Sequence, residues 1–160
     1  MTSVLRPLII SLKPYYADML FDGLKKVELR RRIASHISNR DVYIYVSSPV
    51  RKLRGGFRVG QVWEGSPEDV WNIVEDLSTI NRREFDAYFE GQAVAYALEV
   101  TNVWEYESPV GLNWLRDLFD DFVVPQSWRY AKDGEHETFQ RMMRRPITEG
   151  EKEVEKVEAL

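Results

Sequence analysis

Short apolar runs separated by proline and glycine dominate the first 65 residues, and they predict strands with one intervening helix. A run rich in leucine and isoleucine over residues 7–12 predicts a strand that ends before Pro14. Pro14 suits the first turn of a helix, which Gly23 would end as a left-handed cap. Further strands are expected at residues 25–33, 41–49 and 55–65.

Helical signals become frequent after this point. Ser66 as N-cap, Pro67 at the first helical position and acids in the first turn predict a helix over residues 66–77. A short helix over residues 81–91 should end at Gly91. The next elements are expected as strand, helix, loop or short strand, and helix, at residues 92–106, 111–122, 123–132 and 135–145. Residues 149–160 alternate in charge and predict a surface helix or a loosely held tail.

These elements predict one α+β domain. A chain of 160 residues fits a single domain, and it contains neither an internal repeat nor a Gly- or Ser-rich linker. About five strands with helices inserted between them predict a small, largely antiparallel β-barrel. Four tryptophans lie within apolar patterns and are expected in the core: Trp63, Trp71, Trp104 and Trp114.

The amino-acid composition excludes several kinds of functional site. Cysteine is absent, which excludes disulfides, thiolate zinc sites and cysteine nucleophiles. His36 and His136 lie far apart in the sequence, so we predict no metal site and no cofactor. No window approaches the roughly 18 apolar residues of a membrane span. The N-terminal apolar run is too short for a signal peptide. A cytoplasmic protein that does not contact a membrane is expected.

Charge is distributed unevenly along the chain. Residues 1–60 hold 12 Lys+Arg and 4 Asp+Glu, a balance of +8, whereas residues 61–160 hold 10 and 22, a balance of −12. Such asymmetry indicates either an anionic partner on one side of the molecule or mutual attraction of the two halves within the fold. Composition alone favours neither.

The basic stretch "DGLKKVELRRRI" carries the strongest candidate for an anion site. Because side chains alternate along a strand, one face is mainly apolar and holds Val27, Leu29, Arg31 and Ile33. The other face is wholly charged and holds Glu28, Arg30 and Arg32. Glu28 can pair with Arg30, which leaves Arg32 and Lys25 without an internal partner. A solvated strand face and a ligand site are about equally compatible with this pattern.

"GLKKVELR" fits the pattern G-x-K-x-x-E-x-R, and here the sequence resembles the ASCH domains, relatives of the PUA RNA-binding fold. The fixed positions are Gly23, Lys25, Glu28 and Arg30. "IISLKPYYADMLFDG" and "VYIYVSSPVRKLRGGFRVG" resemble the family's first three strands and first helix. "YFEGQAVAYALEV" and "PQSWRY" resemble archaeal-type members. We therefore expect an ASCH (PUA-like) domain over residues 1–132, and a helical extension or tail packed on it over residues 133–160.

Other polar groups could join such a site. Ser47 and Ser48 could donate to phosphate oxygens, although Ser-Ser-Pro is also ordinary turn chemistry. The segment "PQSWRY" offers Gln126, Ser127, Arg129 and Tyr130 for stacking and phosphate contact, while its tryptophan could equally be a core residue. A basic hairpin could follow a phosphate backbone or simply be solvated; it carries Arg51, Lys52, Arg54 and Arg58.

The resemblance implies a barrel with a cleft whose motif residues face a nucleic acid or nucleotide. We expect binding of single-stranded RNA or nucleotides, in RNA metabolism or translation-linked regulation. The expected ligand-binding residues are Gly23, Lys25, Glu28, Arg30, Arg32, Ser47, Ser48, Gln126, Ser127, Arg129 and Tyr130.

An enzyme is the alternative. Some ASCH relatives are amidohydrolases that act on an acetylated cytidine nucleoside with the motif lysine, a threonine and a glutamate. Lys25 matches the lysine, but the position of the threonine holds Glu28. A further acid would have to come from the helix over residues 66–77, which offers Glu68, Asp69 and Glu75.

Ribonuclease activity has also been ascribed to the wider family. Lys25 beside Glu28 could then act as an acid/base pair in either reaction. A third alternative is a protein-interaction module that uses the acidic C-terminal region.

Overall fold

One curled sheet organises the described part of the chain. The structure is a computed structural model that describes residues 5–146. Its elements, in chain order, are β1 (Leu8–Leu12), α1 (Pro14–Phe21), β2 (Val27–Arg30), β3 (Asp41–Val46), β4 (Lys52–Gly65), α2 (Pro67–Val74), α3 (Arg82–Tyr88), β5 (Ala95–Gly111), α4 (Leu112–Leu118), β6 (Trp128–Tyr130) and α5 (Asp133–Arg141).

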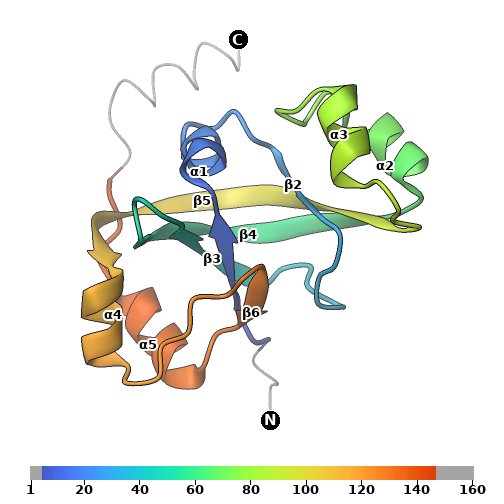
Figure 1. The fold of residues 1–160 in the computed structure, drawn as a ribbon. Helices are drawn as coiled ribbons and strands as arrows, with labels where there is room; N and C mark the ends of the chain where they lie inside the picture. Colours follow the sequence, from blue (N-terminus) through green and yellow to red (C-terminus); the bar gives the residue numbers. More distant parts are fainter. Residues whose placement is uncertain (1–4, 147–160) are drawn as a thin grey trace.

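The sheet has six strands in the order β2-β5-β4-β3-β1-β6. β1 and β3 are parallel, and the other neighbouring pairs are antiparallel. The sheet curls into a half-barrel, so the predicted α+β barrel class is confirmed (Figure 1). β6 adds a sixth strand to the roughly five predicted, within the segment expected as a loop or short strand.

The long β4–β5 pair contacts α2 and α4. In Figure 1, α2 and α3 lie near one end of the pair and α4 near the other. The pairing shifts register around Gly55 and Gly56, where β4 passes very close to β5. A Cβ atom on Gly55 would lie 2.1 Å from the carbonyl oxygen of Trp104, so only glycine fits there.

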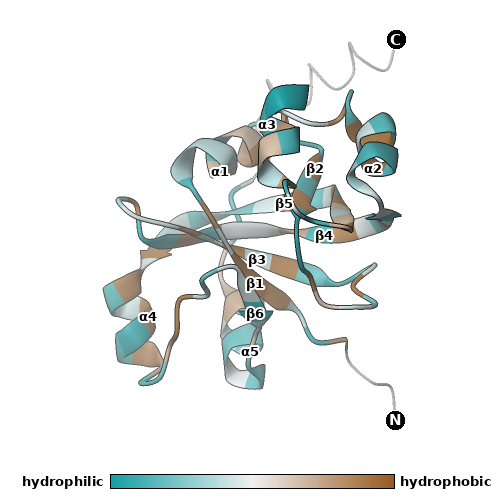
Figure 2. Cartoon of the chain, turned by 45° about the vertical axis from the view of Figure 1, so that its right-hand side comes forward, coloured by the Kyte–Doolittle hydropathy of each residue, from teal (hydrophilic) through white to brown (hydrophobic). Residues whose placement is uncertain are grey.

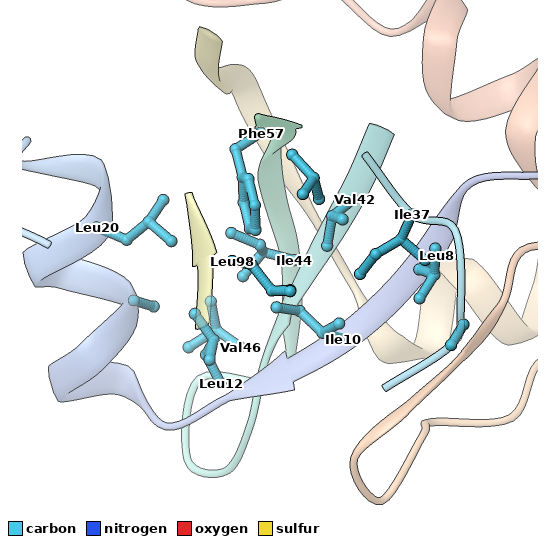
Figure 3. Packing of buried hydrophobic residues seen from close by; sticks show 13 residues of the cluster. Leu8, Ile10, Leu12, Leu20, Ile37, Val42, Ile44, Val46, Phe57 and Leu98 are labelled. Carbon is cyan, nitrogen blue, oxygen red and sulfur yellow. The ribbon is translucent and has the colours of Figure 1, made fainter. Parts of the chain in front are cut away.

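Three apolar clusters hold the fold. The first joins β1, β3 and β4 with Leu20 of α1 and Leu98 of β5 (Figure 3). In the second, Phe139 of α5 packs with residues of β3 and α4. The third places Phe85 of α3 and residues of α2 over β2 and β5. Figure 2 shows hydrophobic positions along β1 and β3, whose two faces are buried in the first and second clusters, and mixed positions along α4, which buries one side.

α2 and α3 begin where the local signals predicted, but they end before the expected bounds, at Val74 and Tyr88. The Ser66 side chain accepts a hydrogen bond from the backbone N–H of Asp69, and Asn81 caps α3 in the same way. Gly23 has φ of 80°, the left-handed conformation expected of it. No helix in residues 5–146 is long and apolar enough to cross a membrane.

Some expectations were wrong in detail. The strand expected over residues 25–33 ends at Arg30, because the chain bends there. Trp114 is 45% exposed rather than in the core. α4 turns Leu115 inward, and neighbouring side chains on a helix point about 100° apart, so Trp114 faces solvent. Trp71 and Trp104 are buried, and Trp63 is partly buried. The predicted tail at 149–160 lies outside the described residues.

Candidate nucleic-acid interface

Residues of β2, α1 and α3 line a cleft of about 390 Å³. In Figure 1, β2 passes between α1 and α3. The walls of the cleft come from β1, α1, β2, α3 and residues 126–127. β2 and β6 are the two outer strands of the sheet. The cleft therefore lies on the open side of the half-barrel, between its two edges.

The turn after α1 brings Lys25 into this cleft. With Gly23 in the left-handed conformation, the backbone N–H groups of Leu24 and Lys25 both reach the carbonyl oxygen of Met19, at 2.9 and 3.1 Å. This ends α1 and directs the chain into β2. The Lys25 side chain is thereby held inside the cleft, and the residue is only 7% exposed.

Three buried charges form the floor of the cleft. The Lys25 Nζ atom lies 3.4 Å from Glu28 Oε1, and Arg30 Nη2 lies 3.4 Å from Glu28 Oε2. Glu28 is 4% exposed and Arg30 is 7% exposed. Burial by itself raises the pKa of Glu28, but the two neighbouring cations and their hydrogen bonds outweigh it and hold that pKa below its ordinary value. The floor is therefore a carboxylate flanked by two cations.

Arg30 joins the two edges of the half-barrel. Its Nη1 atom donates to the carbonyl oxygen and the Oγ atom of Ser127, at 3.2 and 3.0 Å. Its Nη2 atom donates to the carbonyl oxygen of Ser11 at 3.2 Å. These bonds leave Arg30 few donors for a ligand and fix Ser127 at the rim. Because Ser127 Oγ accepts from Arg30, its own O–H can donate to a ligand.

Lys25 has more capacity to contact a ligand. Its ammonium group carries three hydrogens, and Glu28 is its one carboxylate partner among the described residues. The Tyr16 ring lies 5.6 Å from Nζ. Tyr88, on α3, also lines the cleft, and its hydroxyl donates to the carbonyl oxygen of Leu29 at 3.2 Å. Two helices thus present aromatic rings to the same space, which suits a planar base.

The acid at the rim comes from α3. Glu84 lines the cleft, whereas Glu68, Asp69 and Glu75 of the α2 region do not. Glu68 pairs instead with Arg82 on the surface. In the described residues no cluster of three or more His, Cys, Asp or Glu could hold a metal ion.

The structure brings together some predicted residues and separates others. Lys25, Glu28, Arg30, Gln126 and Ser127 line the cleft, and Gly23 shapes the turn beside it. Arg32 lines a neighbouring hollow with Ser127. Residues placed away from both hollows are Ser47, Ser48, Arg129 and Tyr130.

Two of the separated residues have structural contacts. Arg129 makes two 2.8 Å hydrogen bonds to the Glu135 carboxylate, which attach α5 to the segment before it. Tyr130 packs against the first apolar cluster under Arg6. In the basic hairpin, Arg54 pairs with Asp18 and Glu105.

Sequence reasoning missed Tyr16, Glu84 and Tyr88. Each residue lies on a helix whose apolar pattern indicates which side chains pack on the sheet. The sequence around these residues does not indicate which polar or aromatic side chain borders a cleft. Tyr16 lies on α1, the helix directly before the motif, and could have been proposed from that proximity. Glu84 and Tyr88 reach the site only because α3 packs over β2.

Comparison with known proteins gives sequence relatives that match part of this chain and solved structures with a similar fold. No family model matches the sequence. The large ribosomal subunit protein uL22 of Ureaplasma parvum is 32% identical over 106 residues, 66% of this chain. The match covers 34% of uL22, so this chain spans about a third of that relative. An ASCH domain-containing ribonuclease of Zymomonas mobilis is 27% identical over 127 residues, which are 79% of this chain and 85% of that protein.

The crystal structure of ASCH from Zymomonas mobilis superposes with a TM-score of 0.80 at 24% identity, covering 89% of this chain and 99% of the other. The chain therefore has the same α+β fold as that ASCH protein. The sequence match to the ribonuclease of the same organism agrees with this shared fold.

Proposed function

We propose that this protein binds single-stranded RNA in the cleft between α1, β2 and α3, in RNA metabolism or translation-linked regulation. The observation that carries the proposal is the buried group of Lys25, Glu28 and Arg30. Burying ion pairs is costly and seldom improves stability over apolar packing. Two buried cations around one carboxylate leave a net positive charge at the cleft floor. A phosphate would complete this arrangement.

The other residues that line the cleft also suit a ligand with a phosphate group. Lys13, Lys25 and Arg30 outnumber the two carboxylates in the cleft, Glu28 and Glu84. Its volume of about 390 Å³ lies within the range of small-ligand sites, about 300–1,000 Å³. A single nucleotide with its base against a tyrosine fits this description, whereas a duplex keeps its bases stacked and paired.

Binding can be tested by titrating labelled single-stranded RNA, single-stranded DNA and duplex DNA at two salt concentrations. We expect binding of single-stranded RNA that weakens as salt rises, because phosphate contacts release counterions. Lys25→Ala should weaken it at least about tenfold, as loss of a charge-assisted contact does. Absence of binding to every nucleic acid at low salt would overturn the proposal.

RNA cleavage is the second candidate, and the match to a curated ribonuclease favours it. In such a reaction a ribose 2′-hydroxyl would attack the adjacent phosphorus and pass its proton to a base. A 2′,3′-cyclic phosphate would form, and the 5′-oxygen would leave with a proton taken from water. Glu28 is ionised and could accept that proton, although its lowered pKa makes it a weaker base than an ordinary carboxylate. Lys25 could stabilise charge on the phosphate oxygens.

Cleavage is tested with labelled RNA, with and without Mg²⁺, beside acetylated cytidine as a substrate for the amidohydrolase alternative. Products that disappear with Lys25→Ala and also with Glu28→Gln would establish an enzyme with this site. RNA that binds and stays intact under all conditions would restrict the function to binding.

Further assignments are part of the same proposal. Residues 1–132 would form the RNA-binding domain and residues 133–160 an extension of it. The burial of Phe139 in the second cluster supports packing of the described part of this extension, and residues 147–160 lie outside the described residues. The segments 88–100 and 125–130 suggest an archaeal-type member. The cytoplasm is the compartment we propose, and an acidic C-terminal region could hold a protein partner.

A further inference from the structure

A second hollow adjoins the cleft. It has a volume of about 420 Å³ and is lined by Arg31, Arg32, Tyr88, Gln92, Ser127 and Trp128. Tyr88 and Ser127 line both hollows. The two spaces therefore meet along a shared wall, and a ligand that leaves the cleft past Ser127 enters the second hollow.

The bend after β2 supplies the arginines of this hollow. The Arg31 Nε atom donates to the Tyr88 carbonyl oxygen at 2.6 Å, and its guanidinium group lies 4.4 Å from the centre of the Tyr88 ring. Arg31 is thus held in place on α3. Arg32 is exposed and makes no hydrogen bond or ion pair within the described part of the chain. Its guanidinium donors are available to a ligand.

The lining differs from that of the cleft in its charge. Two arginines line the second hollow, and no carboxylate does so among the described residues. Ser127 and Gln92 add neutral hydrogen-bonding groups, and the half-buried Trp128 adds an aromatic ring. Guanidinium groups match the geometry of phosphate oxygens, and indole rings can stack on bases.

We propose that the second hollow binds the neighbouring nucleotide of the same RNA strand, with Arg32 on its phosphate. This inference rests on the proposed RNA-binding function and extends it: the recognised unit is at least a dinucleotide. The strand crosses from one hollow to the other at Ser127. The Ser127 hydroxyl, oriented by Arg30, then faces the phosphodiester that links the two nucleotides.

The test uses a fluorescein-labelled single-stranded RNA octanucleotide, with nucleoside monophosphates and RNA trinucleotides as competitors. Three variants are compared with the wild type: Arg32→Ala, Lys25→Ala and Arg116→Ala. The last is the matched control, because Arg116 is an exposed arginine on α4, outside the lining of both hollows.

We expect Arg32→Ala to weaken octanucleotide and trinucleotide binding about tenfold and to leave competition by the monophosphates unchanged. The slope of log K against log salt should become shallower by about 0.7, the value for one phosphate contact on a single strand. Arg116→Ala should change neither quantity. Lys25→Ala should weaken the binding of the octanucleotide, the trinucleotides and the monophosphates.

Equal effects of Arg32→Ala and Arg116→Ala on octanucleotide affinity and salt slope would overturn the second subsite. An equal loss for monophosphates and octanucleotide in Arg32→Ala would also overturn it, since Arg32 would then act on the first nucleotide. In both cases RNA binding itself would stand. Absence of wild-type RNA binding would instead overturn the proposed function together with this extension.

Discussion

Replacing Glu28 by glutamine removes the one negative charge from the floor of the cleft. The side chain keeps its size, but Lys25 and Arg30, each 7% exposed, lose their shared counter-charge. Breaking a buried ion pair in this way costs about 3–5 kcal/mol. Both distances are 3.4 Å, which is long for an ion pair, so we expect a value near 3 kcal/mol. For a domain of this size, each kcal/mol lowers Tm by about 2–4 °C, which gives a decrease of about 6–12 °C.

Urea unfolding followed by circular dichroism measures this loss, with Glu68→Gln as the matched control. Glu68 also pairs with an arginine, but its side chain is 61% exposed, so its replacement should cost little. Saturating RNA should stabilise Glu28→Gln more than the wild type, because a phosphate takes the place of the missing carboxylate. A loss in Glu28→Gln no larger than in Glu68→Gln would refute the view that the three buried charges act as one unit.

Arg30→Lys should weaken RNA binding at least about tenfold in a titration, nearly as much as Arg30→Ala. The reason is that an ammonium group cannot reach Ser127, Ser11 and Glu28 at once. Wild-type RNA affinity of the lysine variant would contradict this prediction. The pKa of Glu28 is lower in the folded protein than its ordinary value of 4.5, so its stabilising contribution is complete above 4.5 and is lost as pH falls through the lowered pKa. The difference in unfolding free energy between wild type and Glu28→Gln should therefore be constant near neutral pH and shrink in acid. A difference that grows in acid would be inconsistent with the lowered pKa. Phe139→Ala should cost about 3–5 kcal/mol in urea unfolding, because Phe139 of α5 is fully buried against Tyr43 of β3. A negligible loss would mean that α5 is not part of the folded domain.

Local patterns were sufficient to predict that the charged side chains of β2 share one face, which forms the floor of the cleft. Alternation along a strand placed Glu28 and Arg30 in one space and Val27 in the core, because β2 is regular over that stretch. The left-handed turn at Gly23 was also readable, since glycine has a local conformational reason to be there. Both features depend on residues within one turn and one strand.

The remainder depends on distant residues. Arg32 was expected beside Arg30, but the strand ends at Arg30 and Arg31 bonds to the Tyr88 carbonyl of α3, so Arg32 lines a different hollow. Arg129 was expected to face the ligand, yet Glu135 holds it in an ion pair. Such contacts form when separate elements pack together, and hydrophobic periodicity carries no information about them.

The location of the bound RNA tests the central claim most directly. Ultraviolet crosslinking of single-stranded RNA to the wild-type protein, followed by mass spectrometry of the peptides, reports which residues lie against bases. We predict crosslinks to peptides that contain Tyr16, Tyr88 or Trp128, and their loss in Lys25→Ala. Crosslinks confined to the hairpin with Arg51 and Lys52, unchanged in Lys25→Ala, would contradict the proposed cleft.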